Sequence, residues 1–184
     1  MKKIIAFVLV LCSICMLAGC SGKMTSAENF LLAVKKMDFS AMKNELVPDD
    51  KIGSLYSKLD SDLGEESLLT LRNLYALTQY TIEEISEESG GEQSVKILLK
   101  VPDIEKICDH TRVQAMVSAD SAEKIVGDMI ANGSVAKTMM VEETFFIKMK
   151  KEDGVWKIPY ADAENKAFAK ALAIENMIDF FIKY

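Results

Sequence analysis

The sequence predicts an α+β fold, with helices at both ends of the chain and an antiparallel sheet built from segments in the middle. The composition of the 184-residue chain, 49% hydrophobic and 27% charged, is typical of a globular protein. Apolar residues recur at helical spacing in several segments, whereas residues 95–101 and 139–150 alternate between apolar and polar side chains. Because no internal repeat or low-complexity linker divides the chain, residues 25–184 are predicted to form a single domain.

The first twenty residues have the pattern of an export signal. Two lysines precede an apolar run over residues 4–16, and Leu-Ala-Gly-Cys follows at 17–20. The run is shorter than the roughly 20 residues that cross a membrane, which favours a signal peptide. Residues 17–20 resemble the lipobox of bacterial lipoproteins, and this resemblance implies removal of residues 1–19 and a diacylglyceryl group on Cys20. The alternatives are an uncleaved anchor helix and an ordinary secretory signal.

A lipid on Cys20 would hold the protein at the extracytoplasmic face of the cell membrane. Residues 20–24 would then form a short tether that keeps the domain close to the bilayer. Cys12 and Cys15 would leave with the signal peptide, so that Cys108 is the remaining free thiol and no intrachain disulfide is expected. The acidic hairpin predicted around residues 83–92 would be repelled by an anionic bilayer and is expected to point away from it.

The first part of the domain is predicted to be helical. Thr25-x-x-Glu28 is a capping-box pattern, and apolar residues follow it at helical spacing. Asp38 or Ser40 begins a second helical segment, which Pro48 closes. Residues 50–60 and 64–79 are predicted as two further helices, the second with a broad apolar face.

The remaining segments alternate between strand and helix. The predicted elements are a strand beginning at Tyr80, a turn at Gly90-Gly91, a strand over 95–101, two helices within 103–133, a strand over 139–150, a hairpin turn at 152–154, a strand over 155–160 and a helix from about Asp162. Pro102 ends the strand before it, and Asn132-Gly133 stops the second internal helix.

Two motifs resemble a known fold family. Phe30-Leu31-Leu32-Ala33 with Asp38-Phe39, and the closing Lys-Lys-Glu-Asp-Gly-Val-Trp-Lys-Ile at 150–158, resemble small bacterial lipoproteins with a nuclear transport factor two-like fold. The resemblance implies a cone, in which a curved sheet wraps around N-terminal helices and leaves a pocket on its concave face. The chain departs from the family pattern at Met37, where Gly is usual, in the helical insertion at 103–133 and in its long terminal helix.

The candidate pocket of such a cone has an apolar lining. The strand residues that alternate inward are Val95, Ile97, Leu99, Phe145, Ile147 and Met149, and Tyr80, Tyr160 and Trp156 would each add one polar tip. Isomerases on this fold need a carboxylate or histidine base inside the cone, and none is evident here. The pocket or core candidates are therefore Trp156, Tyr80, Phe145, Ile147 and Met149, with Trp156 predicted to lie in the core.

Other groups of reactive side chains fit a chemical role poorly. Cys108 and His110 would suit nucleophilic catalysis, but residues i and i+2 of a helix point about 200° apart. Residues 60–71 fail as a calcium loop because Gly64 and Leu71 stand where oxygen ligands are required. No catalytic residue, metal site or cofactor is therefore predicted.

The terminal helix carries two apolar stripes. One contains Phe168, Ala171, Leu172, Ile178 and Ile182, and the other contains Ile174, Met177, Phe181 and Tyr184, with Phe180 beside it. A helix docked on its own domain needs one stripe. The second is therefore expected to reach beyond the monomer, to a partner helix, a second copy or lipid, or to plug the cone. The alternative is that helix 103–117 or 119–131 covers it.

These observations predict a non-catalytic envelope module that binds a small apolar ligand or a protein, anchored to the membrane through Cys20. The alternatives are a cone-pocket enzyme of isomerase or hydrolase type and a purely structural envelope protein. The formal net charge of −6 argues against a nucleic-acid partner, which requires a basic face. The sequence leaves the oligomeric state open.

Overall fold

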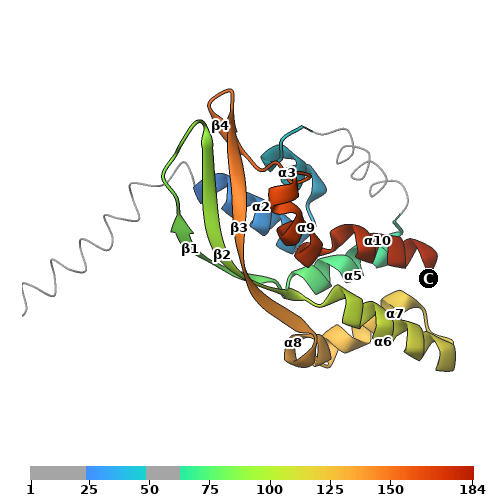
Figure 1. Ribbon diagram of the computed structural model, residues 1–184. Coiled ribbons are helices and arrows are strands. Elements are labelled where there is room, and N and C mark those ends of the chain that lie inside the picture. The colour runs from blue at the N-terminus through green and yellow to red at the C-terminus, as the bar shows by residue number, and fades with distance from the viewer. Residues whose placement is uncertain (1–23, 49–62) are drawn as a thin grey trace, which may run out of the picture.

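The computed structural model describes residues 24–48 and 63–184, which fold as an α+β structure (Figure 1). The helices are α2 (Met24–Lys36), α3 (Phe39–Glu45), α5 (Glu65–Tyr75), α6 (Ile104–Val117), α7 (Ala122–Ala131), α8 (Ser134–Thr138), the 3-10 helix η1 (Ala163–Asn165), α9 (Lys166–Leu172) and α10 (Ile174–Lys183). The strands are β1 (Gln79–Ile85), β2 (Glu92–Pro102), β3 (Met140–Glu152) and β4 (Val155–Lys157). The predicted signal peptide and lipid site at Cys20, most of the tether and the helix at 50–60 lie outside the described residues, as does the start of the rejected calcium loop.

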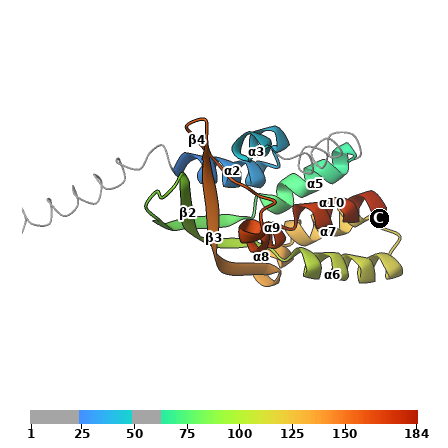
Figure 2. The same ribbon diagram turned by 45° about the horizontal axis from the view of Figure 1, so that its top comes forward.

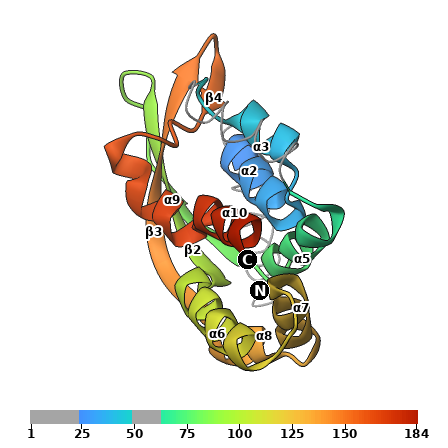
Figure 3. The same cartoon turned by 90° about the vertical axis from the view of Figure 1, so that its right-hand side faces the viewer.

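The described strands form one antiparallel sheet in the order β1-β2-β3-β4. Val95 pairs with Ile147 and Ile97 pairs with Phe145, so the alternating apolar residues of β2 and β3 share one face. The predicted hairpin turn between β3 and β4 is present, with Asp153 and Gly154 at positive φ. Helices α2, α3, α5 and α10 lie on the same side of β2 and β3 (Figure 3).

The concave face of the sheet is packed with aromatic side chains. Phe30 of α2 and Phe168 of α9 are at most 1% exposed, and their ring centroids are 6.0 Å apart. Phe168 also contacts Phe145 of β3 and Tyr160, each with its ring centroid 6.2 Å away. The aromatic side chains of α2 and α9 therefore fill the space next to the concave face.

Capping side chains define the starts of several helices, and the start at Asp38 was predicted from the sequence. Asp38 accepts a hydrogen bond from the Ala41 amide at the start of α3, and Asp103 accepts one from the Lys106 amide at the start of α6. Ser121 caps α7 in the same way. The capping box at residue 25 is not a boundary, because α2 already begins at Met24.

The predicted single terminal helix is wrong. Ala173 adopts a left-handed conformation with φ 46°, which separates α9 from α10. The break lets α9 pack against the sheet while α10 follows α6. Tyr75 of α5 holds the junction, since its hydroxyl donates a 2.7 Å hydrogen bond to the Leu172 carbonyl.

The expectation that the second stripe reaches beyond the monomer is also wrong for most of its residues. Ile174, Met177 and Phe181 are at most 5% exposed, whereas Tyr184 remains 52% exposed. The Cys108 thiol of α6 lies 3.9 Å from the Met177 sulfur, so α6 covers the stripe within the same chain. In Figure 2, α5, α7, α10 and α6 extend side by side beyond the end of the sheet.

Candidate functional site

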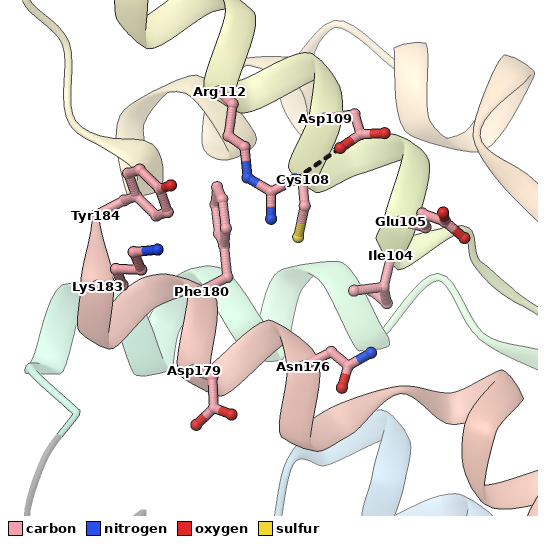
Figure 4. Close-up of a pocket in the computed structure, with 10 residues that line it drawn as sticks. All are labelled: Ile104, Glu105, Cys108, Asp109, Arg112, Asn176, Asp179, Phe180, Lys183 and Tyr184. Atoms are coloured by element: carbon pink, nitrogen blue, oxygen red, sulfur yellow. Dashed lines mark hydrogen bonds and ion pairs between the residues drawn. The ribbon is translucent and has the colours of Figure 1, made fainter.

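A cavity of about 570 Å³ lies between α6 and α10 (Figure 4). We call it the α6–α10 groove. Its lining consists of Ile104, Glu105, Cys108, Asp109, Arg112, Asn176, Asp179, Phe180, Lys183 and Tyr184. Residues 105, 108–109 and 112 lie on successive turns of α6 and share one side of the helix, so they line the same wall of the groove.

The groove has an apolar floor and a charged rim. Ile104, Cys108 and Phe180 are buried and supply the floor. Arg112 donates a 2.7 Å hydrogen bond to Asp109, and its guanidinium lies 5.5 Å from the centroid of the Phe180 ring. Figure 4 shows Arg112 and Phe180 side by side. Such a groove suits a ligand with an apolar part and polar groups that pair with the rim.

The Cys108 thiol is a poor nucleophile in this position. Burial raises its pKa to about 11, and the nearby Asp109 carboxylate also raises it, while Arg112 partly opposes both effects. His110 is exposed on α6, as expected for a residue two positions away on a helix. The Cys108–Asp109–His110 sequence therefore does not form a catalytic pair.

We expect Cys108 in the folded 21–184 fragment to react with a thiol reagent at pH 8 at least about 100-fold more slowly than after unfolding in urea. A thiol with a pKa near 11 is almost fully protonated at pH 8, whereas an unperturbed thiol with a pKa near 8.5 is partly thiolate. Iodoacetamide labelling followed by mass spectrometry measures both rates. Similar rates in the two states would contradict the burial of Cys108.

The described residues offer little for a metal or a membrane span. No group of three or more His, Cys, Asp or Glu residues among them is arranged to hold a metal ion. None of the described helices combines the length and the apolar character needed to cross a membrane.

The pocket and core candidates predicted from the sequence do not lie together in one site. Trp156, Ile147 and Met149 lie in the core, each at most 5% exposed. Phe145 is also buried but borders a second cavity of about 330 Å³ at the edge of the concave face, next to α9. Tyr80 is partly buried, and burial, with a smaller effect of Glu28, raises its pKa.

Sequence reasoning missed Arg112 and Lys183 as parts of a site. The two helices of the groove are separated by more than fifty residues, and neither carries a motif that identifies its partner. The one available signal was the excess of apolar residues at the end of the chain, which indicated that another element must pack there.

Comparisons with known proteins give one distant similarity. No protein-family model matches the chain, and no curated protein sequence matches it. Among solved structures, a chain described as a "putative lipoprotein (ycdA)" from Bacillus subtilis is similar, with 13% sequence identity and a TM-score of 0.40. The similarity covers 80% of this chain and 58% of that one, so this chain spans little more than half of its neighbour. A similarity at this level does not support the transfer of an activity.

Proposed function

We propose that this chain is a lipid-anchored, non-catalytic protein of the cell envelope, a filled variant of the nuclear transport factor two-like cone, that binds a protein partner through the α6–α10 groove. The observation that carries the proposal is the contrast between the two candidate sites. The concave face is occupied by Phe30 and Phe168, whereas the α6–α10 groove is open and combines a buried apolar floor with charged rim residues.

The side chains of the groove support binding rather than catalysis. General acid–base chemistry needs a titrating group free to exchange a proton with the substrate. Asp109 is paired with Arg112, burial raises the pKa of the Cys108 thiol to about 11, and no histidine lines the groove, which leaves Glu105 and Asp179 as its other carboxylates. An apolar floor with opposite charges on its rim is the usual character of a protein-binding surface.

The position of the start of α2 in the fold bears on where the proposed anchor would lie. Near the start of α2, the Ser26 hydroxyl donates a 2.7 Å hydrogen bond to the carbonyl of Trp156 in β4. Figure 1 shows β4 and the α6–α10 region at opposite ends of the molecule. A lipid four residues before α2 would therefore leave the groove facing away from the bilayer.

The expected position of the acidic hairpin does not fit this arrangement. Glu88 pairs with Lys151 of β3 at 3.4 Å, and Lys151 is the cross-strand neighbour of Trp156. Since Trp156 also contacts Ser26, the hairpin and the start of α2 lie at the same end. With a lipid on Cys20, the hairpin would be near the membrane rather than remote from it.

The groove is tested by charge reversal on its rim. Arg112→Glu with Lys183→Glu is expected to reduce recovery of the bound partner at least tenfold in native co-purification followed by mass spectrometry, because both cations line the groove. The matched control is Lys137→Glu, an exposed lysine of α8 outside the groove. Equal recovery with both variants would contradict a role for the groove.

A structural protein that associates with its own copies is the second candidate. The end of α6 exposes three apolar side chains, with Val113 60%, Met116 85% and Val117 79% exposed. Exposed apolar residues gathered on one helix end are a feature of association surfaces.

Met116→Ser with Val117→Ser is expected to leave the free energy of unfolding within about 0.5 kcal/mol of the parent, because both side chains are exposed. If self-association through α6 occurs, sedimentation will show a larger species for the parent and a monomer for the variant. A parent that sediments as a monomer at all concentrations excludes the second candidate.

A further inference from the structure

Part of strand β3 forms an open edge of the sheet. β3 is 13 residues long, whereas β4 pairs with it only at residues 150–152. At Lys148 a side chain closes the edge: the Lys148 amide donates a 2.8 Å hydrogen bond to Asn165 Oδ1, and Asn165 Nδ2 donates a 3.0 Å hydrogen bond to the Lys148 carbonyl. Before Lys148, no described strand pairs with this side of β3.

The backbone groups of residues 142, 144 and 146 point toward the open edge. In an antiparallel strand, the N–H and C=O of every second residue point to the same side. Lys148 bonds outward to Asn165, and the β2–β3 register continues without a shift along the whole of β3. The preceding even-numbered residues therefore direct their N–H and C=O groups away from β2. Among the described residues, no backbone hydrogen bond from outside the sheet reaches these groups.

The opposite edge of the sheet is less regular. β1 shifts its register against β2 between Ile82 and Glu84, and such a bulge interrupts the even spacing of edge groups. The β3 edge has neither a register shift nor a proline. A regular edge with unpaired donors and acceptors is a template for a further strand, and an extended peptide can supply that strand.

A cavity of about 330 Å³ adjoins the open edge, and we call it the edge cavity. Val141, Glu143 and Phe145 of β3 line one wall, and Ala167 and Lys170 of α9 line the wall opposite. Figure 3 shows α9 beside β3. Paired residues of neighbouring strands point to the same face of a sheet. A residue paired with Glu143 on the open edge would therefore direct its side chain toward the edge cavity.

The charged groups at the open edge are mostly acidic. Glu142 and Glu143 are both exposed. The other charged residues of the edge cavity are Asp103, Glu105 and Lys170, so three carboxylates face one ammonium group. This charge balance favours a basic segment on the edge. A second copy of the chain would bring its own glutamates to the same edge, and repulsion between like charges opposes that occupant.

We propose that the open edge of β3 binds an extended, basic segment of a partner polypeptide as an additional antiparallel strand. The backbone of the segment would bond to residues 142, 144 and 146. An apolar residue of the segment would contact Phe146, which is 62% exposed, and a lysine or arginine opposite Glu143 would enter the edge cavity. No β3 residue lines the α6–α10 groove, so this surface is distinct from the groove.

The probe is the blocked pentapeptide acetyl-Val-Thr-Val-Lys-Lys-amide, whose first lysine would lie opposite Glu143 when the central valine pairs with Thr144. Titration calorimetry with the full chain in detergent is expected to give a Kd below about 1 mM. The same peptide with glutamates in place of both lysines is expected to bind at least about fivefold more weakly. No binding of the basic peptide up to about 5 mM, or equal binding of both peptides, would overturn the proposal.

Methylated peptides test the strand geometry without changing the protein. In the proposed pairing, the amide of the central valine faces β3 and the amide of the threonine before it faces away. N-methylation of the central valine is expected to weaken binding at least about tenfold, because it removes a donor and places a methyl group against the edge. N-methylation of the threonine is the matched control and should leave the affinity within about twofold. Equal effects of the two methyl groups would exclude strand pairing.

Variants of Thr144 locate the binding on the protein. Thr144→Pro removes an outward N–H, and a proline is tolerated on an edge strand when its nitrogen faces solvent. This variant is expected to weaken peptide binding at least about tenfold. Thr144→Val keeps the amide and is expected to bind like the parent. Circular dichroism checks that both variants are folded. Unchanged binding by folded Thr144→Pro would place the peptide elsewhere.

Two further outcomes would assign the surfaces differently. Arg112→Glu with Lys183→Glu, the variant that tests the groove, is expected to bind the pentapeptide like the parent. If it weakens binding as much as Thr144→Pro, the peptide occupies the groove and the edge proposal is wrong. A parent that sediments as a dimer, becomes a monomer with Thr144→Pro and binds no peptide would assign the edge to a second copy and overturn the proposal.

Discussion

Replacing Trp156 with alanine is expected to lower the free energy of unfolding by about 3–5 kcal/mol, the usual cost of truncating a buried tryptophan. Trp156 is 5% exposed and lies in the same apolar cluster as Met149 and Ile158. Its indole lies in the three-residue strand β4, so few backbone hydrogen bonds would hold this strand once the side chain is removed. Urea unfolding of the 21–184 fragment, followed by circular dichroism, measures the change.

The neighbouring Val155 provides the control. It lies on the same strand but is 52% exposed, and Val155→Ala is expected to change the free energy of unfolding by no more than about 0.5 kcal/mol. A loss below about 1 kcal/mol for Trp156→Ala would place the indole outside the core. A large loss of unfolding free energy in both variants would instead indicate that β4 tolerates no substitution, whether the side chain is buried or exposed.

Cys20→Ser is expected to abolish incorporation of labelled fatty acid and to move the protein out of the detergent phase. In the proposed anchor the diacylglyceryl group would be bound through the cysteine sulfur, which serine lacks, and the lipobox pattern ends at this residue. Because a diacylglyceryl group supplies two chains, the change in membrane partition is predicted to be large. Fatty-acid labelling in a bacterial host, followed by detergent partition, measures both effects.

Cys15→Ser is the matched control, since Cys15 lies in the apolar run and is expected to be removed with the signal peptide. This variant should be labelled like the parent, and its mature form should have the parent's mass. Equal labelling of the parent and Cys20→Ser would contradict lipid attachment at this position. Loss of labelling in both variants would mean that labelling requires an intact apolar run at residues 4–16, rather than the lipobox cysteine in particular.

The elements of this fold could be predicted where their signals are local. Alternation of apolar and polar residues identifies β2 and β3, because a side-chain period of two is a property of the strand itself. Asp38 predicts a helix start, because a capping side chain bonds to amides only a few residues away. These interactions form within one segment, so they can be recognised without knowledge of the rest of the chain.

The break at Ala173 has no comparable signal. Alanine favours helices, and the apolar spacing continues through it from α9 to α10. Its left-handed conformation is held by the packing of α9 on the sheet and of α10 on α6, together with the bond from Tyr75 to Leu172. Tertiary contacts therefore outweigh the local preference at this residue.

The sequence alone determined the features that depend on neighbouring residues. These are helical propensity, strand alternation, the signal pattern and the apolar character of the inward strand faces. Which apolar surface covers which was decided by the tertiary structure. Met177 is buried because Cys108, 69 residues earlier, lies against it, and the concave face is filled because Phe30 meets Phe168. The α6–α10 groove arises in the same way, since it joins residues from distant segments. Contacts of this kind depend on the relative positions of whole elements. Those positions are set by the burial of apolar surface, which is not directional and therefore leaves no motif in the sequence.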